Sequence, residues 1–76
     1  MHEKGIETFL AVSMSRTLGK AAELLNVTQS TVSYNLSELE SEMGMMLVDR
    51  QKGMKSISLT PAGESFLPLA LKWQEV

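Results

Sequence analysis

The sequence predicts a mainly α-helical domain with one small β-hairpin, on three observations. Between residues 3 and 43, apolar residues recur at helical spacing in three stretches that are separated by capping residues. Two short stretches of mixed apolar and polar residues then flank a glycine-containing loop, as in a hairpin. A Thr-Pro pair finally opens another apolar stretch, which is typical of a helix start. The 76 residues, 43% of them hydrophobic, suffice for one small domain with one core.

The first two helices are expected over residues 3–14 and 18–25. Thr17 is a suitable N-cap for the second helix, and Asn26 tolerates the left-handed conformation that ends a helix. Apolar side chains at helical spacing predict the first helix. These residues are Ile6, Phe9, Leu10 and Met14.

The third helix is expected over residues 28–43, capped by Thr28 and stopped by Gly44. Its apolar residues fall at i, i+4, i+7 and i+11, which predicts a single buried stripe. The stripe consists of Val32, Leu36, Leu39 and Met43. Two helices joined by such a short turn form a helix-turn-helix, whose second helix can enter the DNA major groove.

Residues 47–50 and 56–59 are expected to pair as a two-stranded wing, and a last helix is expected to begin at Thr60-Pro61. Pro68 should kink this helix or remove one of its hydrogen bonds. The predicted architecture is therefore a winged helix-turn-helix over residues 1–60, with a three-helix core, followed by the start of a linker or dimerisation helix over 61–76.

Charge is distributed unevenly around the predicted motif. The net charge is −2, and no Lys or Arg occurs between Ala21 and Asp49. The nearest basic residues flank that segment on both sides: Arg16, Lys20, Arg50, Lys52 and Lys55. This pattern places positive charge at two edges of the motif, where a DNA backbone would pass.

No catalytic pattern is present in the sequence. The chain has no cysteine, its one histidine is His2, and no serine of the motif has a general base nearby. Its methionines are better explained as core filling than as a metal site, because partner His or Cys ligands are missing. We therefore expect no enzymatic activity, no cofactor and no metal. No apolar run approaches the roughly 20 residues that span a bilayer, so no membrane association is expected either.

The whole pattern resembles the N-terminal domain of LysR-type transcriptional regulators. The residues that carry the likeness extend through nearly the whole chain. They are Phe9, Val12, Thr17-Leu18, Lys20-Ala21-Ala22-Glu23, Leu25-Asn26-Val27-Thr28-Gln29, Val32-Ser33, Leu39-Glu40, Met43-Gly44, Leu47-Val48-Asp49-Arg50 and Leu59-Thr60-Pro61-Ala62-Gly63-Glu64. A helix-turn-helix alone is a weak pattern, but its combination with Asp-Arg and Leu-Thr-Pro-Ala-Gly at this spacing is specific.

The resemblance implies a bacterial transcription regulator that binds double-stranded DNA as a homodimer, or as a tetramer in the full-length protein. It implies a cytoplasmic, nucleoid-associated location, and a small-molecule effector sensed only by a C-terminal domain that these residues do not include. The sequence departs from the family pattern at position 34, where Tyr34 stands instead of a frequent Arg. It departs again at position 30, where Ser30 stands instead of a frequent Pro.

The expected DNA contacts follow from helical geometry. With the apolar stripe inward, Ser30, Tyr34 and Ser37 point outward at about 100° per residue. Helix 28–43 would then read the major groove, and wing residues 50–56 would contact the backbone or the minor groove. The predicted DNA-binding residues are Thr17, Lys20, Thr28, Gln29, Ser30, Thr31, Ser33, Tyr34, Arg50, Lys52 and Lys55. The predicted dimer interface on the last helix is Phe66, Leu69, Ala70 and Trp73.

Several alternatives stay open at this point. The serines of helix 28–43 could be only a solvated face, and Tyr34 could pack against its own helix. Arg50 could pair with Asp49 or with a glutamate of the first helix, and Lys52 and Lys55 could be ordinary loop residues. Trp73 could fold back onto the first helix. The domain as a whole could be a protein-interaction module that does not bind DNA.

Overall fold

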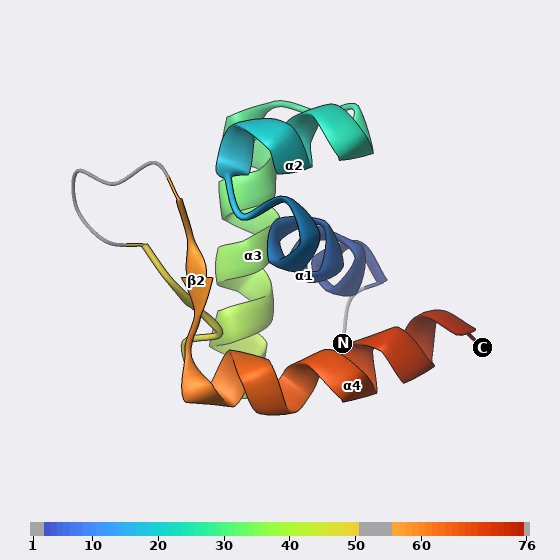
Figure 1. Cartoon of the computed structure of the whole chain (residues 1–76), viewed down its shortest axis with the longest axis vertical. Coiled ribbons are helices and arrows are strands. Elements are labelled where there is room, and N and C mark those ends of the chain that lie inside the picture. The colour runs from blue at the N-terminus through green and yellow to red at the C-terminus, as the bar shows by residue number, and fades with distance from the viewer. Residues whose placement is uncertain (1–2, 51–55, 76) are drawn as a thin grey trace.

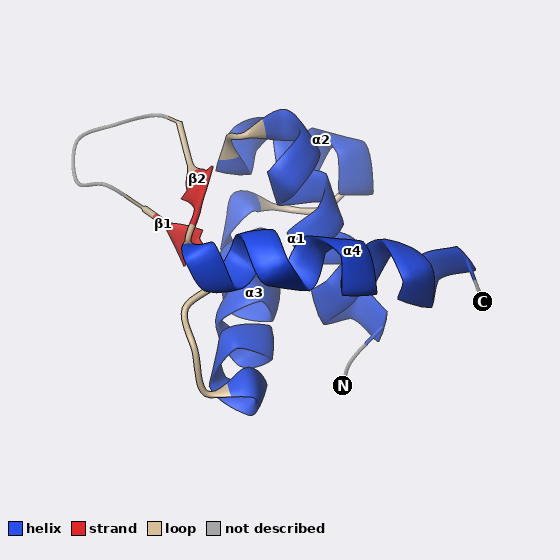
Figure 2. Cartoon of the chain, turned by 60° about the horizontal axis from the view of Figure 1, so that its bottom comes forward, coloured by secondary structure: helices blue, strands red, loops and turns tan. Residues whose placement is uncertain are grey.

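The computed structural model describes residues 3–50 and 56–75. The elements in these ranges are α1 (Glu3–Ser15), α2 (Leu18–Leu25), α3 (Gln29–Met43), β1 (Val48–Asp49), β2 (Ser58–Leu59) and α4 (Pro61–Glu75). Helices α1, α2 and α3 pack against one another, and α4 crosses next to α1 (Figure 1). The two strands lie to one side of α3, and β2 leads directly into α4 (Figure 2).

The helix boundaries agree closely with the prediction. Helix α2 spans the expected residues, α1 ends one residue later than expected, and α3 begins at Gln29 because Thr28 is its N-cap. The two predicted stops also adopt the left-handed conformation, with φ of 58° at Asn26 and 70° at Gly44. These boundaries follow from local capping chemistry, which a single sequence displays directly.

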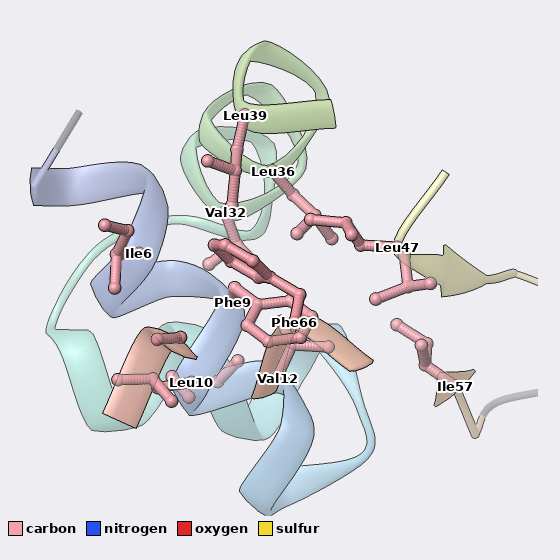
Figure 3. Packing of buried hydrophobic residues seen from close by; sticks show 14 of the residues in the cluster. Ile6, Phe9, Leu10, Val12, Val32, Leu36, Leu39, Leu47, Ile57 and Phe66 are labelled. Carbon is pink, nitrogen blue, oxygen red and sulfur yellow. The ribbon is translucent and has the colours of Figure 1, made fainter. Parts of the chain in front are cut away.

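One hydrophobic core joins all the helices to the hairpin (Figure 3). At its centre the rings of Phe9 and Phe66 meet edge to face, with their centroids 5.3 Å apart and their planes at 61°. The predicted stripe of α3 faces this centre, except that Met43 is only half-buried. The buried apolar residues are Ile6, Phe9, Leu10, Ala11, Val12, Ala21, Ala22, Val32, Leu36, Leu39, Leu47, Val48, Ile57, Phe66 and Ala70.

The two strands are shorter than predicted. They pair antiparallel through Val48 with Leu59 and Asp49 with Ser58, whereas four residues were expected in each strand. The physical reason is that neighbouring backbone groups are bonded elsewhere. The N–H of Leu47 donates to a carboxylate oxygen of α3 (2.8 Å), and the N–H of Ile57 donates to the carbonyl of Arg16 (2.7 Å).

The start of α4 is built tightly against the segment before β1. Thr60 Oγ1 accepts from the N–H of Gly63 (3.0 Å) and donates to the carbonyl of Met46 (2.6 Å). A Cβ at Gly63 would lie 2.0 Å from the carbonyl oxygen of Leu47, so only glycine fits there. The predicted cap and helix start at Thr60-Pro61 are thus confirmed.

Helix α4 runs through Pro68 without interruption. Because proline has no N–H, the carbonyl of Glu64 lacks its usual helical donor at that turn.

Phe66 and Ala70 on one side of this helix are buried in the domain's own core. They are therefore not available for a dimer interface, and that part of the prediction is wrong. Within the described ranges, no helix combines the length and apolar character needed to cross a membrane.

Candidate nucleic-acid interface

The outer face of α3 is polar and open to solvent. Ser30, Tyr34 and Ser37 are all exposed, and Tyr34 has 65% of its surface accessible. Most of the Tyr34 ring is therefore accessible to a partner, and the alternative that it packs along its own helix stays open. Thr31 and Ser33 are partly exposed on the flanks of this face. The helix thus presents hydroxyl and phenol groups outward, while its apolar stripe fixes its orientation on the core.

The starts of α2 and α3 are capped in the same way. The N–H of Lys20 donates to Thr17 Oγ1 (3.0 Å), and the N–H of Thr31 donates to Thr28 Oγ1 (3.1 Å). The hydroxyls of Thr28 and Thr31 also lie within hydrogen-bond distance of each other (2.9 Å). Each cap satisfies one N–H of its first turn, and the remaining first-turn donors suit phosphate oxygens.

A groove lies where these two helix starts approach the hairpin. Four of the predicted DNA-binding residues line it: Thr17 at the N-cap of α2, Lys20 on α2, Gln29 on α3 and Arg50 after β1. Glu23 of α2 also lines the groove and adds one negative charge to its two cations. The other lining residues are Leu18, Gly19 and Ile57. The fold therefore gathers residues that are far apart in the sequence at one place.

Arg50 is paired with a residue that the sequence analysis did not name. Its Nη2 atom lies 4.0 Å from Oε1 of Glu40, and neither Asp49 nor a glutamate of α1 is paired with it among the described contacts. The Glu40 side chain is only 6% exposed, whereas that of Arg50 is 32% exposed. A signal for this was present: Glu40 follows the buried Leu36 by four residues, so it shares the inward face of α3.

The other wing residues cannot be placed. Lys52 and Lys55 lie outside the described residues, so their predicted contacts stay predictions. Within the part of the chain that the structure describes, no group of three or more His, Cys, Asp or Glu residues is arranged to hold a metal ion.

Comparison with known sequences identifies related proteins. Residues 4–64 match the family described as bacterial regulatory helix-turn-helix protein, lysR family. The chain is 48% identical over 65 residues to the HTH-type transcriptional regulator HdfR of Yersinia enterocolitica, and 46% identical to HdfR of Yersinia pestis. Each alignment covers 86% of this chain but only 22% of the relative, so the chain spans less than a quarter of the length of these regulators.

Comparison with solved structures supports the same relationship. The CbnR DNA-binding domain in its DNA complex superposes with a TM-score of 0.92 at 31% identity, covering 99% of this chain and 84% of that one. The BenM DNA-binding domain bound to catB site 1 DNA gives 0.90 at 31% identity, with 99% and 81% covered. Vibrio fischeri DarR in complex with DNA gives 0.90 at 36% identity, with 99% and 25% covered. These likenesses confirm the predicted fold.

Proposed function

Because this chain belongs to the LysR family of bacterial regulatory helix-turn-helix proteins, we propose that its winged helix-turn-helix binds double-stranded DNA and regulates transcription. The observation that carries this proposal is the exposed polar face of α3 beside a groove lined by Lys20 and Arg50. The DNA complexes of CbnR, BenM and DarR are of proteins similar to this one, and they support the proposal.

We assign two roles within this surface. Gln29, Ser30, Ser33 and Tyr34 lie on the exposed or flanking side of the first turns of α3, where side chains reach base edges in a major groove. Gln suits adenine, hydroxyls suit several bases, and a tyrosine ring can contact the thymine methyl.

The second role is backbone contact. The caps Thr17 and Thr28 sit at helix starts, where phosphate oxygens are favoured, and Thr31 lies at the same end of α3. Lys20 and Arg50 line the groove beside them. Lys52 and Lys55 belong to the proposed wing contact by sequence position alone. About four to six phosphate contacts per subunit would make binding salt-sensitive.

The test is a gel shift with duplexes selected from a random pool, at low and raised salt. We expect retarded complexes that weaken as salt rises. Ser33→Ala and Tyr34→Ala should change the preferred bases, whereas Arg50→Ala should weaken all sequences alike. A domain that only associates with other proteins would give no salt-dependent shift, and equal sequence-blind losses from all three variants would exclude α3 as the reader.

We further propose that α4 contributes to a homodimer through its outer side. Leu69 is 62% exposed and Trp73 is 52% exposed, and exposed apolar surface of this kind suits an interface. Trp73 also lines a small pocket with Ile6 of α1. Light scattering at micromolar concentration should give a dimer, and Leu69→Glu should give a monomer. A wild-type chain that is only monomeric counts against this interface.

The proposed dimer also has consequences for the DNA site and for the rest of the regulator. A two-fold dimer would match a roughly palindromic site with two half-sites. Residues 61–76 would begin the linker helix, and effector sensing would reside in a region outside this chain. We place the protein in the bacterial cytoplasm at the nucleoid, with no catalytic activity and no cofactor.

A further inference from the structure

Glu40 is the one buried carboxylate among the described residues, and the DNA-binding surface described above does not include it. It lies near the end of α3 with its side chain 6% exposed. Burying a charged group is costly unless it is paired and hydrogen-bonded. A buried glutamate in so small a core therefore indicates specific contacts that compensate for the lost hydration.

Those contacts are all made to the segment that leads into the wing. Oε2 of Glu40 accepts from the backbone N–H of Leu47 (2.8 Å) and from that of Val48 (3.2 Å). Oε1 lies 4.0 Å from Nη2 of Arg50. One carboxylate therefore contacts three groups of the same segment. These are the backbone N–H groups just before β1 and at its first residue, and the guanidinium of Arg50 just after β1.

Glu40 lies on the inward side of α3, the helix whose outward side is proposed to read DNA. The outer face of the same helix carries Ser30, Tyr34 and Ser37, which are proposed to face DNA. Because a helix is rigid over this length, a group fixed to its inward side is also fixed relative to its outward side. Glu40 therefore couples the position of Arg50 to the position of the reading face.

We propose that Glu40 is a positioning residue for DNA binding, which sets the wing and the Arg50 guanidinium at a fixed place relative to α3. The inference rests on the proposed DNA-binding function. Glu40 itself makes no contact with DNA and acts through Arg50 and the first strand of the wing. Removing a negative charge from a DNA-binding protein by itself strengthens DNA binding. A positioning role for Glu40 predicts the opposite, namely that its removal weakens binding.

The test uses Glu40→Gln, which keeps the shape and an acceptor oxygen but removes the charge and turns an NH₂ group toward Arg50 or an amide. The matched control is Glu42→Gln, which makes the same change at an exposed position of the same helix. We expect E40Q to bind a selected duplex roughly five- to tenfold more weakly, because the negative charge is lost and the single remaining oxygen cannot serve both Arg50 and the two amides. E42Q should bind as tightly as wild type or more tightly.

Three further measurements distinguish positioning of Arg50 from a general loss of stability. Circular dichroism gives the folded fraction of each variant at the binding temperature, and Kd is corrected for it, so that lost stability alone leaves the corrected Kd unchanged. If Glu40 acts through Arg50, E40Q should also lower the salt slope by up to about one, toward that of R50A. In the R50A background, E40Q should weaken binding by less than it does in wild type.

The outcomes distinguish the two proposals. If wild type binds no duplex in a salt-dependent way, the proposed function fails. If wild type binds and folded E40Q binds equally well or more tightly, the positioning role of Glu40 is overturned while the function stands. If E40Q does not fold, Glu40→Asp takes its place, because it keeps the charge but is too short to reach both amides and Arg50. Unchanged binding by folded E40D would overturn the proposal as well.

Discussion

The turn between α2 and α3 and the wing are held in place by hydrogen bonds of different range in the sequence. In the turn, the N–H of Asn26 bonds back to the carbonyls of Ala22 and Glu23, and Thr28 caps the helix that follows. In the wing, the N–H of Ile57 bonds to the carbonyl of Arg16, far away in sequence. The turn therefore depends on neighbouring residues, whereas the wing depends on the packed positions of other elements.

This difference concerns function as well as folding. Each strand has only two residues, which is too little for a hairpin to be stable alone. The wing is placed by α3, by the segment between α1 and α2, and by the start of α4. Substitutions far from DNA should therefore move the wing more readily than they move the turn. Three stability measurements test this contrast.

The largest effect is expected at the junction of the wing with α4. Gly63→Ala would place a Cβ 2.0 Å from the carbonyl oxygen of Leu47, so backbone must move. Overpacking of this kind should cost about 3 kcal/mol of unfolding free energy. The control is Gly19→Ala, whose Cβ would meet nothing closer than the flexible end of Gln29 at 3.4 Å. Urea unfolding should show G19A equal to or more stable than wild type, and an equally stable G63A would contradict the packing described here.

A smaller effect is expected in the turn. Thr28→Ala removes the acceptor for the N–H of Thr31 and should cost about 1 kcal/mol, as for other N-caps. Thr28→Ser keeps the hydroxyl, so its unfolding free energy should stay close to that of wild type. Thermal unfolding of the two variants checks this. A loss in T28A as large as that in G63A would show that the turn, too, depends on distant packing.

The smallest effect is expected at Arg16, which has φ of 64° without being glycine. Asparagine tolerates this left-handed conformation better than arginine does. The anchor for Ile57 is the backbone carbonyl, which Arg16→Asn retains. We expect unfolding free energy to rise by up to about 1 kcal/mol, offset in part by loss of the bond from Arg16 Nε to the carbonyl of Ser13. A marked loss of stability in R16N would instead show that the Arg16 side chain, and not only its carbonyl, is needed to hold this segment.

The same contrast explains how much could be predicted from the sequence. The caps Thr17 and Thr28 and the stops Asn26 and Gly44 are local signals, so the helices were placed correctly. The strand lengths were predicted wrongly, because the N–H groups of Leu47 and Ile57 donate to acceptors that are distant in the sequence instead of to the neighbouring strand. Long-range hydrogen bonds leave no periodic trace in a sequence.

The candidate site divides in the same way. The exposed face of α3 follows from helical periodicity, and Tyr34 and the serines lie where expected. On α4 the apolar residues cover too wide an arc for periodicity to say which side meets the core. Phe66 was therefore assigned to a partner although it packs on Phe9. The partner of Arg50 was missed because charged residues are ordinarily expected in solvent.

Pro68 lies between Phe66 and Ala70, both of which are anchored in the core. A proline in mid-helix ordinarily kinks the helix at that point. Because the residues on both sides of Pro68 are fixed in the core, we expect the two halves of α4 to move as one rigid unit with the domain. A torque applied at its far end would be transmitted through the ring of Phe66 to α1, and then to the helix that is proposed to meet DNA.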